Sequence, residues 1–412
     1  MNFPAYPHYK PSGVEWLGDV PEHWEIQLLR YITRLAYGNS LSADDRESGE
    51  IAVYGSNGQI GSHVQENTLA PVIVVGRKGS FGKVNFSKTS VFAIDTTYFI
   101  DQSQTKSHLR WLYYLLDCLR LDSISKDSAV PGLAREDAYS NCIAFPPTAE
   151  QQAIAIFLDY ETGKLDSLVA KKREFIERLK EKRTALISHT VTRGLPPDAA
   201  RAAGIPKNPP LKPSGIEWIG DIPAHWNIVP LRYAFHNFDN RRIPLSGEER
   251  ATKEKIYPYY GASGIIDYVD EFLFNEILIL VAEDGANLLS RSSPLAFLAS
   301  GKYWVNNHAH ILKPIIGDIR FWTAVLQIFD YTPLVTGAAQ PKLTGERLGS
   351  ICLPMPPATE QSIIADYLHN ETMKLDLIVA KVEEAVERLQ EYRAALISSA
   401  ITGKIDVRKA TQ

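Results

Sequence analysis

The sequence predicts an α+β protein in which two globular mixed α/β domains form a pseudo-twofold repeat, joined by two long antiparallel helices that pair as a coiled coil. Three observations support this fold class. The segment KPSGVEWLGDVPEHWEIQLLRY (10–31) returns as KPSGIEWIGDIPAHWNIVPLRY (212–233), and we call these the leading blocks. A second segment, PPTAEQQAIAIFLDYETGKLDSLVAK, begins at Pro146 and returns at Pro356 as PPATEQSIIADYLHNETMKLDLIVAK. We call the regions that begin with these segments, 146–193 and 356–403, the trailing blocks. The segments between the blocks differ, so one architecture carries two variable segments.

These repeats set the predicted domain boundaries. We expect a first globular domain at 1–145, a first long helix at 146–193, a linker at 194–211, a second globular domain at 212–355, a second long helix at 356–403 and a tail at 404–412. At about 150 residues per domain, a chain of 412 residues lets each half bury its own core. The linker region is rich in Pro and Ala, which predicts a connecting segment with some local helix.

Composition narrows the class of protein. With 45% hydrophobic and 22% charged residues, the chain is typical of soluble globular proteins. No stretch approaches the ~20 apolar residues that span a bilayer, and the start, MNFPAYPHYK, lacks the features of a signal peptide. We therefore expect a cytoplasmic protein with no membrane association, and Cys118, Cys142 and Cys352 suit free thiols in a reducing compartment. The net charge of −4 counts against binding nucleic acid by charge alone, without excluding a local basic surface.

The variable segments follow one plan in both halves. Short apolar runs at 71–76, 91–100, 276–285 and 303–312 predict strands between glycine-rich turns. SHLRWLYYLLDCL (107–119) and DIRFWTAVLQIF (318–329) each predict an amphipathic helix. The turn YGSNGQIG (54–61) corresponds to YGASGIID (260–267), and GRKGSFG (76–82) corresponds to AEDGANLLS (282–290). The two domains are therefore expected to share a fold and to differ in their polar loops.

The trailing blocks predict long helices with a heptad seam. Residues at alternating spacings of three and four predict one apolar stripe per helix. The predicted seam consists of Leu165, Leu168, Phe175, Leu179 and Leu186 in the first helix, and Leu375, Ile378, Val382, Leu389, Tyr392 and Leu396 in the second. Thr148 and Gln151 suggest a capping box at the start, and Gly194 and Gly403 stand where the helices should end. Each seam could pair with the other in the same chain, or with a second chain in a homodimer.

The sequence contains no recognisable catalytic motif. It has no phosphate-binding P-loop, no HExxH zinc motif, no paired-cysteine zinc spacing and no GxSxG elbow. His308 and His310 could ligate a metal, but no third ligand stands near them in the sequence, so we expect hydrogen-bonded residues at a strand end and no metal. His23 and His225 each stand just before a tryptophan in the leading blocks, where packing or capping is expected.

The variable segments do offer side chains that suit base recognition. Arg and Lys donate to guanine, Asn and Gln form paired hydrogen bonds with adenine, and Asp or Glu accept from cytosine. The candidate DNA-binding residues are Ser56, Asn57, Arg77, Lys78, Ser80, Lys83, Thr97 and Tyr98 in the first half, and Ser263, Glu283, Asp284, Asn287, Asn306, Asn307, His308, Gln340 and Lys342 in the second. As a set they differ between the halves, as two readers of different half-sites would.

Taken together, the paired motifs resemble those of the specificity subunit of type I restriction–modification enzymes. The likeness is carried by PPxxEQ…ETxKLD at Glu150-Gln151 and Glu360-Gln361, by the two leading blocks and by the two unlike variable segments. It implies two target-recognition domains, at about 12–145 and 214–355, that each read half of a bipartite asymmetric DNA site, with two helices that set the gap.

The resemblance also implies a non-catalytic chain with several partners. Those partners are double-stranded DNA, two methyltransferase subunits and, through them, motor–nuclease subunits. No cofactor is expected on this chain, because S-adenosylmethionine, ATP and Mg would be bound by the partner subunits. From the residues alone, Leu165 to Leu186 spans about 32 Å at ~1.5 Å per residue, close to one turn of B-DNA at ~34–36 Å. A coiled-coil scaffold whose globular domains bind proteins rather than DNA is the alternative.

Overall fold

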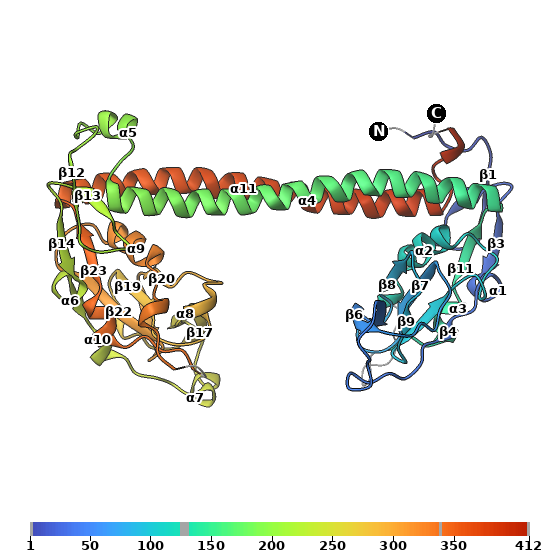
Figure 1. The fold of residues 1–412 in the computed structure, drawn as a ribbon, viewed down its shortest axis with the longest axis horizontal. Helices are drawn as coiled ribbons and strands as arrows, with labels where there is room; N and C mark the ends of the chain where they lie inside the picture. The colour runs from blue at the N-terminus through green and yellow to red at the C-terminus, as the bar shows by residue number, and fades with distance from the viewer. Residues whose placement is uncertain (1–2, 124–131, 338–339, 410–412) are drawn as a thin grey trace. The chain divides into compact units, whose positions relative to one another are not determined.

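The computed structural model describes residues 3–123, 132–337 and 340–409, and the chain divides into two compact units. The first unit consists of residues 1–173 with 383–412, and the second consists of residues 174–382. The long helices α4 (Thr148–Arg193) and α11 (Ala358–Ile401) each contribute one part to each unit. Two mixed α/β domains and two long helices are therefore present as predicted (Figure 1).

The first unit contains three small antiparallel or mixed sheets besides its strand pair at the start of the chain. Its elements are β1 (Tyr9–Pro11), β2 (Asp19–Pro21), β3 (Glu25–Leu28), α1 (Leu29–Ile32), β4 (Ala36–Tyr37), β5 (Ile51–Gly55), β6 (Gly58–His63), β7 (Val72–Gly76), β8 (Val84–Ser87), β9 (Phe92–Ala93), β10 (Thr97–Ile100), α2 (Leu109–Cys118), η1 (Leu121–Ser123), α3 (Arg135–Tyr139), β11 (Cys142–Phe145) and η4 (Val407–Lys409). The sheets have the strand orders β4-β10-β7-β8, β6-β5-β9 and β11-β3, and the remaining pair is β1-β2.

The second unit repeats this plan with a few additions. Its elements are α5 (Pro197–Ala202), β12 (Leu211–Pro213), β13 (Asp221–Pro223), β14 (Asn227–Pro230), α6 (Leu231–Ala234), β15 (Phe235–Asn237), η2 (Asp239–Arg241), α7 (Gly247–Ala251), β16 (Tyr257–Gly261), β17 (Gly264–Val269), β18 (Phe274–Asn275), β19 (Leu278–Ala282), α8 (Asn287–Ser290), β20 (Ala296–Ala299), β21 (Lys302–Val305), β22 (Ala309–Pro314), α9 (Ile319–Ile328), η3 (Thr332–Leu334), α10 (Gly345–Ser350) and β23 (Cys352–Met355). The order β15-β22-β19-β20 matches β4-β10-β7-β8 strand for strand.

The central strands form where the sequence offers continuous β-branched or apolar runs. Every residue of β7 (VIVVG) and of β19 (LILVA) is buried, which is typical of a strand covered on both faces. In the first unit α2 packs on β7 and β8, and in the second α9 packs on β19 and β20. The strands predicted at 71–76 and 276–285 and both amphipathic helices are therefore confirmed, and the local helix predicted for the linker is α5. The runs at 91–100 and 303–312 are a correction, because a turn divides each of them into two strands, β9 and β10 in the first domain and β21 and β22 in the second.

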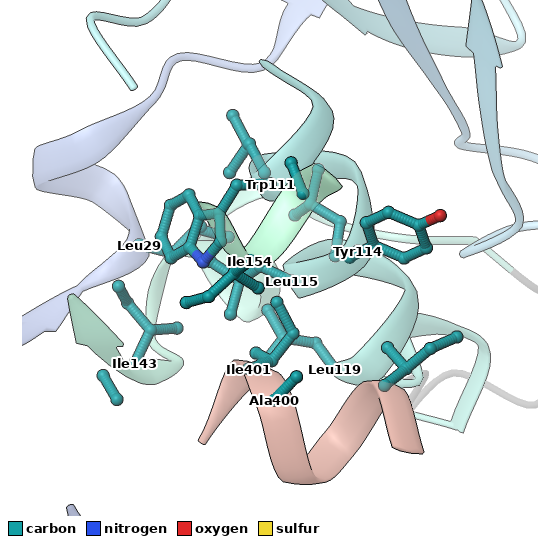
Figure 2. Close-up of a cluster of buried hydrophobic side chains, with 14 of the residues drawn as sticks. Leu29, Trp111, Tyr114, Leu115, Leu119, Ile143, Ile154, Ala400 and Ile401 are labelled. Atoms are coloured by element: carbon teal, nitrogen blue, oxygen red, sulfur yellow. The ribbon is translucent and has the colours of Figure 1, made fainter. Parts of the chain in front are cut away.

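The core of the first unit joins the leading block, the variable segment and both long helices. Figure 2 shows Leu29 of the leading block beside Trp111 and Leu115 of α2, with Ile154 of α4 and Ile401 of α11 in the same cluster. All five side chains are at most slightly exposed. Burying each aliphatic side chain contributes about 1.5–3 kcal/mol, so the two helix ends hold this domain in place by ordinary hydrophobic packing.

The long helices pair antiparallel within each unit. In the first unit the start of α4 packs beside the end of α11, where Arg393 Nε lies 2.9 Å from Asp166 Oδ1. In the second unit the end of α4 packs beside the start of α11, where Arg183 Nε lies 3.2 Å from Asp376 Oδ1. The two aspartates occupy the same place in the repeated KLD motif. The pairing predicted within one chain is therefore confirmed.

Four of the predicted seam positions stand one residue before the position that faces the partner helix. Leu179, Leu375 and Leu396 are buried, and Leu165, Leu186, Val382 and Leu389 are partly buried, as predicted. Four others lie on the outer surface with 38% to 47% of their area exposed: Leu168, Phe175, Ile378 and Tyr392. The inward positions at those turns are one residue later, at Val169, Ile176, Val379 and Arg393. Both choices keep a spacing of three or four and most pairs are apolar in either choice, so heptad counting could not separate them.

The ends of the helices agree with one prediction and correct another. Gly194 and Gly403 have φ values of +84° and +74°, so glycine ends each helix in the left-handed conformation, as expected. The capping box predicted for Thr148 and Gln151 is replaced by a different arrangement. The Gln151 amide donates to the Pro146 carbonyl, and its Oε1 accepts the backbone N–H of His108 at 2.9 Å, which ties α4 to the start of α2.

Candidate nucleic-acid interface

In the first domain, the antiparallel pairing of β7 with β10 brings several candidate residues together. Arg77 and Lys78 follow β7, and Thr97 and Tyr98 open β10 opposite the end of β7. Two residues that the sequence did not single out join them: Tyr37 of β4, which pairs with Tyr98, and Arg135 at the start of α3. The result is a cluster of two arginines and two tyrosines from four separate elements.

Both guanidinium groups lie against the exposed ring of Tyr37. The Cζ atom of Arg77 lies 4.8 Å from the centroid of the Tyr37 ring, and that of Arg135 lies 3.9 Å from it. Arg77 also donates from Nη1 to the Asp95 carbonyl at 2.9 Å. Stacking on an aromatic face orients a guanidinium while leaving its N–H groups to reach other acceptors.

Three first-domain candidates support these loops from within. Tyr98 is buried and donates its hydroxyl to the Leu133 carbonyl at 3.0 Å, while Thr97 donates to the Ile94 carbonyl and Ser56 to the Thr96 carbonyl. Burial and the nearby Tyr37 raise the pKa of Tyr98 to about 12, despite the two arginines, so the hydroxyl remains a donor. The structure therefore places these three side chains inside the domain, with their hydroxyls already bonded, whereas Arg77 and Lys78 reach its surface. The base contacts predicted for all five stay a prediction.

The other first-domain candidates gather at a second place. Lys83 Nζ donates to both the carbonyl and the side-chain oxygen of Asn57, at 2.9 and 2.8 Å. Ser80 and Lys83 line a cavity of about 800 Å³ that Arg120 and the α11 residue Arg393 also line. The candidates of this domain thus divide between the tyrosine–arginine cluster and this cavity.

In the second domain, the pairing of β19 with β22 brings the acidic and histidine candidates together. Asp284 and His308 face each other, with Oδ2 and Nδ1 2.7 Å apart. Lys342 Nζ lies 3.2 Å from Glu283 Oε1, and Glu283 is also paired with Arg242, a residue that the sequence did not single out. The carboxylates are therefore engaged with basic side chains of the same domain, and their predicted contact with bases stays a prediction.

The remaining second-domain candidates divide between surface and interior. Asn306 is buried and accepts the backbone N–H of His308 at 2.8 Å, and Asn287 accepts the backbone N–H of Ser293 at 2.9 Å. Asn306 and Asn287 thus shape their loops, and their predicted role as base contacts stays a prediction. Exposed side chains are those of Ser263, Asn307, His308, Gln340 and Lys342.

His310 is a buried member of this second cluster. Its Nδ1 lies 2.6 Å from Asp239 Oδ2, and its Nε2 lies 2.9 Å from the Leu343 carbonyl oxygen. Burial opposes ionisation of Asp239, but the hydrogen bond and charge of His310 hold the pKa of Asp239 below its usual range. His310 is therefore a hydrogen-bonded strand residue, as expected from the sequence.

The same cluster contains the third ligand that the sequence did not reveal. Three possible ligand atoms lie within 4.8 Å of one another, one each from Asp239, Glu283 and His310. A metal ion could bridge atoms at this spacing. Arg242, however, is ion-paired with Glu283 and lies 3.8 Å from Asp239, while both nitrogens of His310 are hydrogen-bonded. Arginine already supplies the positive charge that a metal would bring, so these residues do not fit a cation site.

A further element shared by the two halves of the repeat is a buried carboxylate in each unit. In the first unit Glu150 accepts from Trp24 Nε1 at 2.9 Å and from the Tyr6 hydroxyl at 3.0 Å, and its Oε1 lies 2.6 Å from His23 Nε2. In the second unit Glu360 accepts from Trp226 Nε1 at 3.1 Å and its Oε2 lies 2.8 Å from His225 Nε2. The histidines predicted to serve packing or capping thus bind the first turn of the following long helix.

Comparisons with known proteins agree with this repeated architecture. The family described as "Type I restriction modification DNA specificity domain" matches residues 21–178 and 223–388. A type I restriction enzyme specificity subunit of Haemophilus influenzae is 32% identical over 160 residues, which is 38% of this chain and 38% of that protein. The EcoBI specificity subunit of Escherichia coli is 33% identical over 63 residues, 15% of this chain and 13% of that one. Both alignments span less than half of the relative's length.

A solved structure supports the fold at low sequence identity. This structure is described under complex assembly and conformational transition of the type I R-M system. The match covers 94% of this chain and 99% of that one, with a TM-score of 0.60 and 13% identity. In the part of the chain that the structure describes, no helix is both long and apolar enough to cross a membrane. Because the family matches both halves over most of their length, the chain belongs to the type I restriction modification DNA specificity family.

Proposed function

We propose that this chain is the DNA sequence-specificity subunit of a type I restriction–modification complex in the cytoplasm. Each variable domain reads one half of a bipartite asymmetric DNA site, and the paired helices set the gap between the halves. The single observation that carries this proposal is that one fold, closed by the same buried glutamate in each unit, presents two different sets of polar loops. Two readers built on one frame are what an asymmetric bipartite site requires.

The chain itself is non-catalytic in this proposal. Its contribution is recognition, while methyl transfer with S-adenosylmethionine and any ATP- and Mg-dependent step belong to partner subunits. The family match favours this role over the alternative of a coiled-coil scaffold whose domains bind only proteins.

The helices support docking of two methyltransferase subunits, one on each unit. Ile156 and Tyr160 of α4 expose more than half of their surface in the first unit, and Met373 and Leu377 of α11 do so in the second. These four residues stand on the outward side of helices whose inward residues are already paired. Exposed apolar groups on a helix surface are typical of protein–protein contacts.

The experiment is selection of duplexes from a randomised pool by the chain assembled with its methyltransferase partner. We expect a selected sequence with two specific parts separated by a fixed number of unspecific pairs. The variant Arg77→Ala should weaken selection in only one of those parts, because Arg77 lies at the surface of the first domain. Selection of no sequence by the wild-type complex, or equal weakening in both parts, contradicts the proposal.

A further inference from the structure

The two domains place different chemistry at one equivalent position of their sheets. In the first sheet Thr97 lies opposite Gly76, the last residue of β7, and in the second Ala309 lies opposite Ala282, the last residue of β19. The next residue after each of those strands accepts the same backbone hydrogen bond. Leu133 N–H donates to the carbonyl of Arg77 at 2.8 Å, and Leu343 N–H donates to that of Glu283 at 2.7 Å.

The second layer of the position is equivalent too. Tyr98 follows Thr97 and donates to the Leu133 carbonyl, while His310 follows Ala309 and lies 2.9 Å from the Leu343 carbonyl. A tyrosine and a histidine therefore fill one place in the same hydrogen-bonding frame. Arg77 corresponds in the same way to Glu283, so a cation in one domain is replaced by an anion in the other.

In the first domain, Arg77 and Arg135 have no carboxylate partner among the described residues. Among the described residues, Arg135 makes no hydrogen bond or ion pair, and its Nε is buried without a hydrogen-bond partner. Its guanidinium is held only by the faces of Tyr37 and Tyr98. A planar guanidinium fixed by aromatic rings retains several N–H groups in a rigid fork, which is the geometry that matches guanine O6 and N7.

The second domain uses carboxylates to hold its outward-facing donors. The side chains of Lys342 and His308 are 53% and 46% exposed, whereas those of their partners Glu283 and Asp284 are 10% and 15% exposed. The exposed groups are single-point donors, unlike the forked arginines of the first domain. The acidic pair therefore acts on the ligand through these two donors.

We propose that this equivalent position is the specificity-determining subsite of each domain, an inference that rests on the proposed function. In the first domain Arg77 and Arg135, oriented by Tyr37, donate to the major-groove edge of guanine. In the second domain Lys342 and His308 donate to acceptor atoms of the other half-site, with Glu283 and Asp284 as positioning residues. Changing the side chains here changes the bases read without altering the frame that carries them.

The test is the same duplex selection with the assembled complex, using conservative variants. Arg135→Lys keeps the charge but removes the fork, so we expect guanine preference at one position of one half-site to fall about tenfold, with the other half-site unchanged. Lys88→Ala, which removes an exposed cation elsewhere on the first domain, should leave every base preference unchanged. Arg135→Ala should match or exceed the effect of Arg135→Lys, and unchanged selection in the other half-site shows that each variant complex is assembled.

The second domain gives an independent arm. Asp284→Asn should alter base preference only in the half-site that Arg135→Lys leaves intact, because the neutral amide no longer holds the imidazole of His308 by charge. Unchanged preferences in these variants, or weakening spread evenly over all positions, would overturn the subsite assignment while the wild-type complex still selects a bipartite sequence. If the wild-type complex selects none, the proposed function itself fails.

Discussion

Replacing Glu150 by alanine should destabilise the first unit more than the matching change at Glu360 destabilises the second. Glu150 accepts from two buried donors, the indole N–H of Trp24 and the hydroxyl of Tyr6, whereas Glu360 accepts from one such donor, the indole N–H of Trp226. Burial and the adjacent carboxylate hold the pKa of Tyr6 well above its usual range, so its hydroxyl stays a donor.

The magnitude follows from the donors left without an acceptor. A buried donor that loses its partner costs about 1–3 kcal/mol, so Glu150→Ala should cost about 2–6 kcal/mol and Glu360→Ala about 1–3 kcal/mol. Glu150 also lies near two basic side chains, His23 and Arg408, whose Nη1 is 3.5 Å from Glu150 Oε1. They add little to the cost of the substitution, because both side chains are 43% exposed and can be hydrated when the carboxylate is removed.

Hydrogen exchange is the suitable assay, because a chain with two units need not unfold in one step. The free energy of local opening should be measured for β1 and β2 in Glu150→Ala and for β12 and β13 in Glu360→Ala. Tyr6→Phe supplies a control, since Glu150→Ala should cost less in that background by about the energy of one buried hydrogen bond. A cost for Glu360→Ala equal to or larger than that for Glu150→Ala would refute the reasoning.

Three further predictions concern the helices and the second cluster. Leu179→Asp buries an unpaired charge in the seam and should cost several kcal/mol and prevent methyltransferase assembly in size-exclusion chromatography, whereas the control Leu168→Asp, at an outward position, should change stability by less than about 0.5 kcal/mol. Gly403→Ala places a side chain at φ +74° against Pro21 of the leading block, so it should promote hydrogen exchange at the end of α11. Gly215→Ala is the control, because it has a similar φ of +73° but open space around it, and it should promote exchange around residue 215 to a smaller extent. Because the pKa of Asp239 is lowered on folding, its stabilising effect is present above about pH 3.8 and lost as the pH falls further; Asp239→Asn should remove this dependence from an acid titration of second-unit exchange.

The repeat revealed the architecture because its physical signals are local. Strands such as β7 are continuous apolar runs, the amphipathic helices have their own periodicity, and Gly194 and Gly403 end helices through a backbone conformation that glycine favours. The phase of the seam was not local information. Leu168 and Val169 are both apolar, and the choice between them depends on packing at the far ends of the helices, where Ile154 and Ile401 meet the domain core.

The surface clusters were only partly predictable for a related reason. Arg77 and Lys78 could be recognised because they follow a strand in a polar loop. Tyr37 and Arg135 could not, because each belongs to a different element. Tyr37 meets Arg77 only through the order of strands in the sheet, and Arg135 lies on α3 and meets the ring of Tyr37. The burial of Tyr98 was equally hidden, because a polar residue at a strand end can satisfy its hydroxyl inside the domain.

The shared and variable residues therefore do separate physical tasks, and this separation explains why two loops of opposite charge can stand on one frame. Each unit is closed by a buried glutamate that joins the leading block to the first turn of a long helix, and this closure does not involve the loops after β7 or β19. Replacing Arg77 by an acidic residue would leave Glu150 and its donors untouched, just as Glu283 coexists with Glu360 in the second unit. The side chains of the loops can consequently change at little cost to the stability of the domain that presents them.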